Sequence, residues 1–366
     1  MDKISELASI LSDSLNWNKA RLDCFVRMLL ALFAVRTVNL SEIAVGFASK
    51  AQVTSRYKRL QRFFRLFQID YSLIAKLVFG LFFIADKKIY LTIDRTNWFW
   101  GKAKINVLTL GIAYEGAAIP ILWTTLNKAG NATAAEHQAI IERFISLFGK
   151  GSIAGILADR EFASGALFCW LNQEHVPFYI RIKEGSLLWV KNEKFHTANK
   201  LFNHLNAKEQ GIFGMNVTLF GAKVYLAGSR SEKGELMIVA TNQSPKNAIA
   251  CYLRRWEIET LFSCLKGRGF RFEDTHLTQL DRVEKLMALL TIGFCWAHKT
   301  GEWRATIKPV VFKKHRDSQR PQSSYFRYGF DFIRELILSP FKKLSIFKAS
   351  LQAFITPPQP VSEEAL

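Results

Sequence analysis

Four side chains in the segment Ala250–Gly269 have types and spacing that suit phosphoryl chemistry. If the segment is one helix, Tyr252, Arg255, Glu259 and Lys266 share a stripe about 60° wide beside an apolar stripe. One carboxylate among cations fits a metal ligand flanked by phosphate-binding groups. The alternative is a solvated stripe with an ordinary i,i+4 pair between Arg255 and Glu259. Because the stripe is polar, its two cations are expected to tolerate alanine without unfolding.

The metal interpretation needs two further carboxylates, and two follow apolar, strand-like runs upstream. Lys87–Trp100 carries Asp94 near the expected end of a buried strand, and Ile153–Phe162 carries Asp159 where its apolar run stops. A lone aspartate at a strand end is usually a turn or cap residue. A trio of carboxylates instead supplies the hard oxygen ligands that Mg²⁺ prefers. Two ions about 4 Å apart could activate an attacking hydroxyl and stabilise the leaving oxygen of a phosphodiester.

The stripe and the trio together resemble a known family, the bacterial transposases of the insertion-sequence-4 family. The residues that match its YREK signature, with intervals of two, three and six residues, are Tyr252, Arg255, Glu259 and Lys266. The residues that match its DDE pattern are Asp94, Asp159 and Glu259. The run Asp159-Arg160-Glu161-Phe162 is similar to the second-acid motif of the family. The resemblance covers residues 85–270.

This resemblance implies cut-and-paste transposition with two Mg²⁺ (or Mn²⁺) ions. The enzyme would bind double-stranded DNA at the terminal inverted repeats of its element, nick each end and join the freed 3′-OH to target DNA. By the family pattern, Asp94 would bridge both ions, while Asp159 and Glu259 would each hold one. The residues that would orient the phosphates are Tyr252, Arg255 and Lys266. Because two ends are cut and joined together, a dimer or higher oligomer is expected on DNA.

Relatives in this family excise through a DNA hairpin and hold a flipped base on an aromatic side chain of a β-rich insertion. The resemblance makes Trp189 the candidate for that role, and a tryptophan buried in the core is the alternative. Glu161 lies just past the second acid. The family pattern gives the metal to Asp159, so Glu161 is interpreted as structural.

The elements predicted around these acids form an α/β fold. Three strand-like runs, a helix at Ala132–Leu147, a strand ending at Asp159, a second helix and the strand Phe178–Ile182 follow in the order of an RNase H-like core. Pro120 inside the third run predicts an edge strand. The first part of the core is expected at 85–184, a β-rich inserted subdomain at 185–243, and the helix of the third acid with its successor at 244–300.

Residues 1–75 are predicted to form an all-helical DNA-binding region. The expected helices are Lys19–Phe33, a short one that Ser41 caps and that runs through Phe47, and Ala51–Phe67, which is the outline of a helix-turn-helix. Four cations lie opposite the apolar face of the last helix with no acid among them: Lys58, Arg59, Arg62 and Arg65. They are candidate DNA contacts, and the alternative is a cationic face that serves solubility alone.

A helix is also predicted at Gln279–Trp303. The region 301–366 is expected to contain a basic surface segment, Lys308–Tyr328, and to end in a polar, disordered tail at 355–366.

Composition bounds the class of protein. The 366 residues carry 50 Lys+Arg against 31 Asp+Glu, a formal net charge of +19 that predicts a polyanionic partner, nucleic acid before an anionic membrane surface. Hydrophobic residues make up 49%, which excludes a largely disordered chain. Five scattered cysteines without a CxxC pair are typical of reduced residues in a cytoplasmic protein. The longest apolar runs fall short of the ~20 residues of a membrane span, and a membrane protein is not expected.

We therefore predict a DNA transposase, cytoplasmic and associated with the bacterial nucleoid. One alternative is a metal-dependent nuclease with the same core that cuts DNA without joining it. The other is a non-catalytic, sequence-specific DNA-binding repressor. The three acids argue against the repressor.

Overall fold

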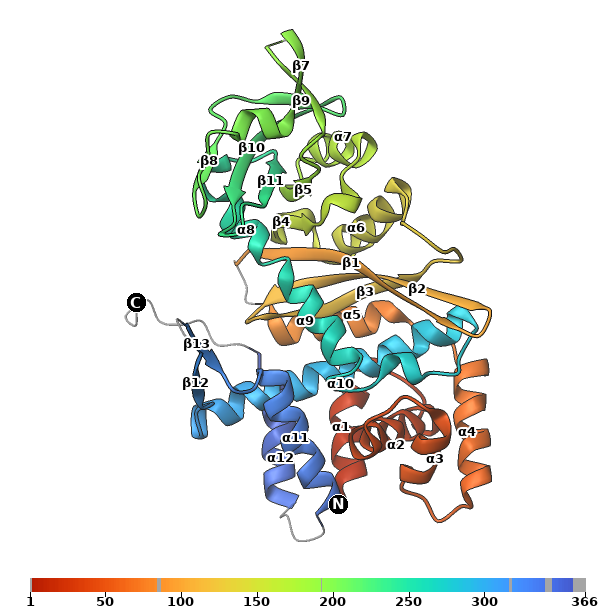
Figure 1. The fold of residues 1–366 in the computed structure, drawn as a ribbon. Coiled ribbons are helices and arrows are strands. Elements are labelled where there is room, and N and C mark those ends of the chain that lie inside the picture. The colour runs from red at the N-terminus through yellow and green to blue at the C-terminus, as the bar shows by residue number, and fades with distance from the viewer. Residues whose placement is uncertain (1, 84–86, 192, 316–317, 340–343, 358–366) are drawn as a thin grey trace. The chain divides into compact units, whose positions relative to one another are not determined.

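The computed structural model describes residues 2–83, 87–191, 193–315, 318–339 and 344–357 (Figure 1). The chain divides into two compact units. The first unit contains Met1–Ala85, Asn97–Asn106 and Thr260–Leu366. The second unit contains Asp86–Thr96 and Val107–Glu259. The polar tail predicted at 355–366 lies, from residue 358 onward, outside the described residues.

The second unit is built on a sheet whose first five strands follow the order β3-β2-β1-β4-β5. β4 pairs in parallel with both β1 and β5, and β3 is antiparallel to β2. This arrangement is the RNase H-like core that the sequence predicted. The strands are β1 (Ile89–Trp100), β2 (Ala103–Tyr114), β3 (Ala117–Thr125), β4 (Ile153–Ala158) and β5 (Phe178–Ile182).

The predicted edge position of Pro120 is confirmed. Proline lacks an amide hydrogen, so a strand containing it is best placed where one side needs no ladder partner. β3 ends the sheet, and the pairing with β2 shifts register next to Pro120. The turn between the two strands holds Glu115 and Gly116 at positive φ, 45° and 81°.

Two helices follow the predicted pattern between these strands. α6 (Ala134–Phe148) begins with a capping box, in which Thr133 and Glu136 each bond to the backbone of the other. α7 (Gly165–Gln173) begins after Ser164, whose hydroxyl accepts from the Leu167 amide. α6 and α7 pack against each other.

The strands of the predicted insertion extend the core sheet itself. β11 pairs with β5 in an antiparallel ladder, and the order then continues β10-β9-β6-β7, with β8 beside β10. β5 is therefore not left as an open edge, which would be a template for unwanted pairing. These strands are β6 (Leu187–Val190), β7 (Glu193–Thr197), β8 (Gln210–Ile212), β9 (Val217–Leu219), β10 (Ala222–Arg230) and β11 (Leu236–Thr241).

The first unit is largely helical. The three predicted N-terminal helices are present as α2 (Lys19–Val35), α3 (Leu40–Gly46) and α4 (Val53–Leu66). The expected Ser41 cap is wrong: Asn39 caps α3, its side chain accepting from the Ser41 amide. The sequence did not predict α1 (Lys3–Leu15), α5 (Tyr71–Phe82), α11 (Tyr325–Leu338) or α12 (Leu344–Ile355). The hairpin of β12 (Phe312–His315) and β13 (Ser318–Pro321) forms within the predicted basic segment, whose Arg316 lies outside the described residues.

α10 (Leu280–Ile307) is the central helix of the first unit. Its buried side chains run on all faces from Val283 to Gly301, as expected of a helix surrounded by protein. α11 crosses it where a glycine on each helix permits close approach. A Cβ on Gly329 would collide with the Ala297 carbonyl, and one on Gly301 with the backbone of Tyr325.

No single helix among the described residues is long and apolar enough to cross a membrane. α2 and α3 reach that length and composition only together, and they are bent by 99° at their break.

Candidate active site

Asp94 and Asp159 are brought side by side by the parallel pairing of β1 with β4. The paired register ends with Ile93 opposite Ala158, so each aspartate is the next residue on its own segment. Each carboxylate Oδ1 accepts the amide hydrogen of the following residue at 2.8 Å. Asp159 follows its strand as predicted. The prediction that Asp94 lies near a strand end is wrong, because β1 continues to Trp100 after its pairing with β4 ends.

Asp94 is a mostly buried carboxyl group in an acidic neighbourhood. Burial raises its pKa to about 6, and the nearby charges of Glu161 and Asp159 act in the same direction. The Arg95 amide and the Arg255 guanidinium oppose this rise. An ionised Asp94 is therefore poorly compensated by the protein alone, which favours a bound cation.

Arg255 joins the three predicted acids in one network. Its Nη2 bonds to Glu259 Oε1 at 2.8 Å, and its Nη1 lies 3.8 Å from Asp94 Oδ2. Its Nε donates to the Tyr252 hydroxyl at 3.1 Å, and that hydroxyl donates to Asp159 Oδ1 at 3.3 Å. Burial raises the pKa of Tyr252 to about 12, so the phenol keeps the proton that it donates. Two residues of the predicted signature thus contact all three acids.

The helix that carries these residues is broken. The sequence predicted one helix over Ala250–Gly269, but α8 (Ala248–Leu253) ends before Arg254 and α9 (Trp256–Leu265) begins after Arg255. Amides in this break bond three residues back, Arg255 to Tyr252 at 2.8 Å and Ile258 to Arg255 at 3.1 Å. The tighter turn contains neither glycine nor proline, so no residue type in the sequence indicates a break in the helix. Tyr252 therefore does not continue the helical stripe of Glu259.

Tyr252 and Arg255 are also buried, with 1% and 3% of their surface exposed. Tyr252 packs in an apolar cluster with Leu157, Tyr179 and Val239. The expectation that Arg255 lies on a solvated polar stripe and tolerates alanine is therefore wrong. The predicted i,i+4 contact with Glu259 exists, but it belongs to a buried network.

The donor chemistry of the three acids fits a divalent cation. Carboxylate oxygens are hard ligands, and the pKa of Asp94 is raised first by burial and further by the charges of Glu161 and Asp159. Within the described part of the chain, no three histidine, cysteine, aspartate or glutamate side chains lie close enough together to hold one ion. In this arrangement the Arg255 guanidinium supplies the positive charge between Asp94 and Glu259.

A second ion pair, which the sequence did not predict, joins the two segments that carry Asp94 and Asp159. Arg95 binds Glu161 through two parallel hydrogen bonds, Nε to Oε1 at 3.1 Å and Nη2 to Oε2 at 3.2 Å. Arg95 Nη2 also donates to Asn131 Oδ1 at 2.6 Å. Arg95 directly follows Asp94, and Glu161 lies two residues after Asp159, so this Arg95–Glu161 clamp joins the two acid-bearing segments. The only sequence signal was a pair of opposite charges close to the two acids, Arg95 and Glu161.

Lys266, the last residue of the predicted signature, belongs to the first unit. Its amide donates to the Phe262 carbonyl at 2.9 Å and so closes the last turn of α9. Its Nζ pairs with Glu273 Oε1 at 2.7 Å and lies 6.0 Å from the centre of the Trp98 ring.

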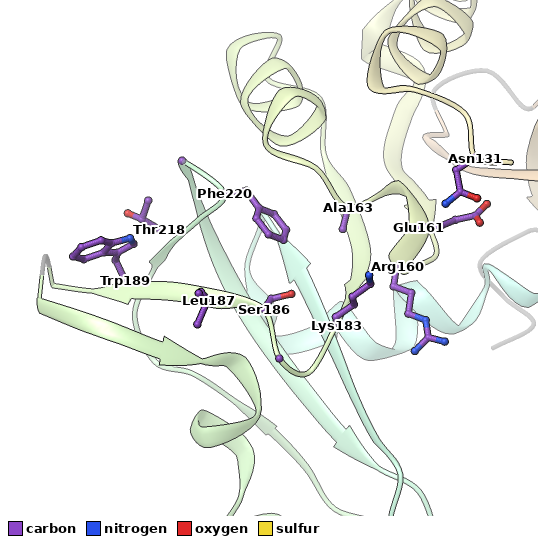
Figure 2. A pocket seen from close by; sticks show the side chains of 12 residues that line it. Asn131, Arg160, Glu161, Ala163, Lys183, Ser186, Leu187, Trp189, Thr218 and Phe220 are labelled. Atoms are coloured by element: carbon purple, nitrogen blue, oxygen red, sulfur yellow. The ribbon is translucent and has the colours of Figure 1, made fainter.

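Trp189 lines a cavity of about 1010 Å³ in the second unit (Figure 2). Its side chain is 41% exposed, so the alternative of a buried core tryptophan is wrong. Figure 2 shows Phe220 and Lys183 between Trp189 and the end of the cavity where Arg160 and Glu161 lie. The cavity thus extends from an aromatic side chain on β6 to the residues next to Asp159.

The four cations predicted on α4 are not equivalent. Arg59 pairs with Asp23 at 2.9 Å, donates to the Ala20 carbonyl at 3.1 Å and lies over the Phe47 ring. Arg59 is therefore already paired with an acid, because Asp23 comes from α2, which a single-helix pattern cannot show. Lys58, Arg62 and Arg65 are exposed, as predicted.

The strand order and the two aspartates at the β1–β4 pairing, with a glutamate on a later helix, define an RNase H-like core of the DDE class. The family model for the transposase DDE domain matches residues 88–311, more than half of the chain. The protein belongs to this family. It is a transposase, an enzyme that cleaves DNA with divalent metal ions.

No curated protein matches the sequence. Among solved structures, the chain is similar to the piggyBac transposase in a synaptic complex with hairpin DNA, determined by cryo-EM. The TM-score is 0.47 at 11% identity, over 99% of this chain and 84% of that chain. A likeness this distant carries no argument about function.

Proposed function

We propose that the protein is the transposase of a bacterial insertion sequence of the insertion-sequence-4 family, and that it moves its element by cut-and-paste transposition. The observation that carries this proposal is the Arg255 network. Tyr252 and Arg255 of the YREK pattern contact Asp94, Asp159 and Glu259 of the DDE pattern. Two further residues of the YREK pattern thus belong to the same network as the three acids, which supports the resemblance.

Asp94, Asp159 and Glu259 would hold two Mg²⁺ or Mn²⁺ ions. When bound, such ions activate the attacking hydroxyl and stabilise the leaving oxygen of an in-line displacement. The chain holds the two aspartates directly after the last paired residues of β1 and β4, Ile93 and Ala158. The Arg95–Glu161 clamp keeps this spacing.

Arg255 in the second unit and Lys266 in the first unit would each bind DNA phosphate. A guanidinium has five N–H donors, and the contacts to Tyr252, Asp94 and Glu259 engage three different nitrogens. Two donors are left for phosphate oxygens, and Tyr252 fixes the plane of the group. Lys266 carries the same positive charge, which it would share between Glu273 and a phosphate.

The cavity lined by Trp189 would hold a base flipped out during hairpin excision. Stacking on an aromatic ring is tolerant of base identity, and Trp189 and Phe220 both line the cavity. Lys183 and Arg160 supply positive charge for the adjoining phosphates.

DNA recognition would come from the helical N-terminal region, with Lys58, Arg62 and Arg65 as the available cations of α4. Terminal inverted repeats and target DNA would be the partners, bound by a dimer or higher oligomer in the bacterial cytoplasm. The net charge of +19 supports a polyanionic partner.

The test uses DNA that carries the ends of the element, taken from the sequence flanking the gene. Asp94→Ala, Asp159→Ala and Glu259→Ala should each bind this DNA at least as well as wild type, yet show no nicking or strand transfer in Mg²⁺ or Mn²⁺. Wild-type nicking without joining would favour the nuclease alternative. Cleavage at the wild-type rate by any one variant would remove that residue from the triad.

A further inference from the structure

The first unit contains a cationic hollow of about 490 Å³ between two helices that are far apart in sequence. The hollow is lined by Lys58, Gln61, Arg62, Arg65 and Arg282. Spacings of three and four residues place the α4 members on one face of that helix. Arg282 enters from the first turn of α10.

The positive charge of this hollow is not neutralised by the protein. Within the described part of the chain, no carboxylate lies within ion-pair distance of its four cations. Asp281 lies beside Arg282 in sequence, but Lys285 Nζ holds its carboxylate at 3.2 Å. Arg282 Nε is buried and has no hydrogen-bond partner. A buried donor of this kind is normally satisfied, and the described part of the chain supplies no acceptor for it.

A buried lysine holds the two walls of the hollow together. Lys285, only 2% exposed, donates from Nζ to the Phe64 carbonyl at 2.9 Å, in the last turn of α4. A cation at a helix C-terminus is favourable there. Because Lys285 and Arg282 share one face of α10, this bond sets the position of Arg282 relative to Arg65.

The neighbouring cations of α4 contrast with those of the hollow. Arg59 is engaged by Asp23. Arg56 donates to backbone carbonyls, among them Ser49 at 2.7 Å and Ala51 at 2.8 Å. Both arginines connect α4 to other parts of the fold. Of the hollow cations, Arg62 donates to the Lys58 carbonyl at 3.4 Å, one turn back on the same helix, and among the described residues none of the four pairs with a carboxylate.

We propose that this hollow binds the backbone phosphates of duplex DNA, with Arg282 as a contact from α10. The inference rests on the proposed function for the presence of DNA. Guanidinium groups suit phosphate because their N–H donors match two oxygens at once. From Lys58 to Arg65 the helix advances about 10 Å, longer than a single phosphate, so a run of phosphates along a strand fits better than a free ion.

The test measures binding of the full chain to a fluorescent random-sequence duplex, in EDTA, as a function of salt. Arg282→Ala should lower the log–log salt slope by close to one unit, which weakens binding about eightfold at 0.1 M salt. Arg282→Lys should restore most of the slope because it keeps the charge. The matched control is Arg59→Ala, which should leave the slope unchanged because Asp23 already neutralises that arginine.

The proposal that the hollow binds DNA is overturned if Arg282→Ala has the same salt slope as wild type while circular dichroism shows an intact fold. If Arg282→Ala fails to fold, Arg62→Ala and Arg65→Ala on the exposed face of α4 replace it, and two unchanged slopes overturn the proposal. Because EDTA prevents cleavage, the result is independent of catalysis. If the salt slope falls in Arg282→Ala but the wild-type protein cannot cut DNA, the DNA-binding role of the hollow is supported and only the proposed function is contradicted.

Discussion

Replacing Asp94 by asparagine should stabilise the metal-free protein at alkaline pH. The pKa of Asp94 rises from 3.8 to about 6 on folding, chiefly because of burial. Each unit is worth about 1.4 kcal/mol, so folding an ionised Asp94 costs about 3 kcal/mol. The folded pKa is the higher one, so the native state binds more protons between these values. Stability therefore falls as pH rises from 3.8, and the loss is complete above about 6.

Asparagine cannot ionise, so Asp94→Asn should be more stable than wild type by about 3 kcal/mol at pH 8 and by roughly half of that at pH 5. Urea unfolding in EDTA at the two pH values measures the difference, which should grow by about 1.4 kcal/mol. A difference that is constant or reversed would refute the reasoning that Asp94 is a buried charge that its neighbours compensate only in part.

The opposite sign is expected at Asp23, which serves as the control. Burial acts to raise the pKa of Asp23, but the hydrogen bonds from Arg27 and Arg59 outweigh it and lower that pKa. Asp23→Asn should therefore lose stability at pH 8, and the loss should shrink as pH falls through the titration range. Added Mg²⁺ should stabilise wild type at pH 8 and not Asp94→Asn, because a ligand that binds only the folded state raises stability by mass action.

Three further predictions follow from contacts described above. Arg255→Ala should lower the free energy of unfolding in urea by about 3 kcal/mol because it leaves Asp94 and Tyr252 buried without their partner. Glu259→Gln changes a half-exposed carboxylate and should cost no more than about 1 kcal/mol. Equal costs would contradict a buried network centred on Arg255. Glu161→Gln should lower the free energy of unfolding by about 1–3 kcal/mol and slow nicking. The double variant Arg95→Glu with Glu161→Arg should recover part of the stability and part of the nicking rate. Additive losses in this double-mutant cycle would contradict the Arg95–Glu161 clamp. Gly329→Ala should lower the free energy of unfolding by about 1–3 kcal/mol because it overpacks the α10–α11 crossing. Gly80→Ala, with open space around it, should stabilise α5 by up to about 1 kcal/mol. Similar effects of the two substitutions would refute the close approach of α10 and α11.

Local patterns were sufficient for the core strands and for the place of Asp159 after β4, whereas they placed Asp94 too close to the end of β1. β1, β4 and β5 are visible in the sequence as apolar runs. Pro120 indicated the edge position of β3 because proline has no amide hydrogen for a ladder bond. The Arg255 network could be predicted from the sequence only in part. Its i,i+4 contact with Glu259 follows from spacing, but the break at residues 254–255 contains no glycine or proline. The buried state of Tyr252 depends on strands that a helical wheel does not include.

Contacts between distant segments were beyond the sequence patterns. Asp23 neutralises Arg59 from another helix, and Arg282 joins the α4 cations across more than two hundred residues of chain. The Arg95–Glu161 clamp likewise depends on the parallel register of β1 and β4. In each case the charges were visible in the sequence, and their partners were set by tertiary packing.

The division of the first unit into separate chain segments has a consequence for synthesis. α1–α5 leave the ribosome well before α10 and α11, yet Phe33 on α2 packs against Trp296 and Phe330, each with ring centroids 5.1 Å apart. Until those helices emerge, the apolar faces of the N-terminal helices lack their partners, and such non-local contacts form slowly. The hollow between α4 and α10 therefore cannot assemble on a nascent chain that has not yet reached residue 282, and an N-terminal fragment of this protein would present α4 without it.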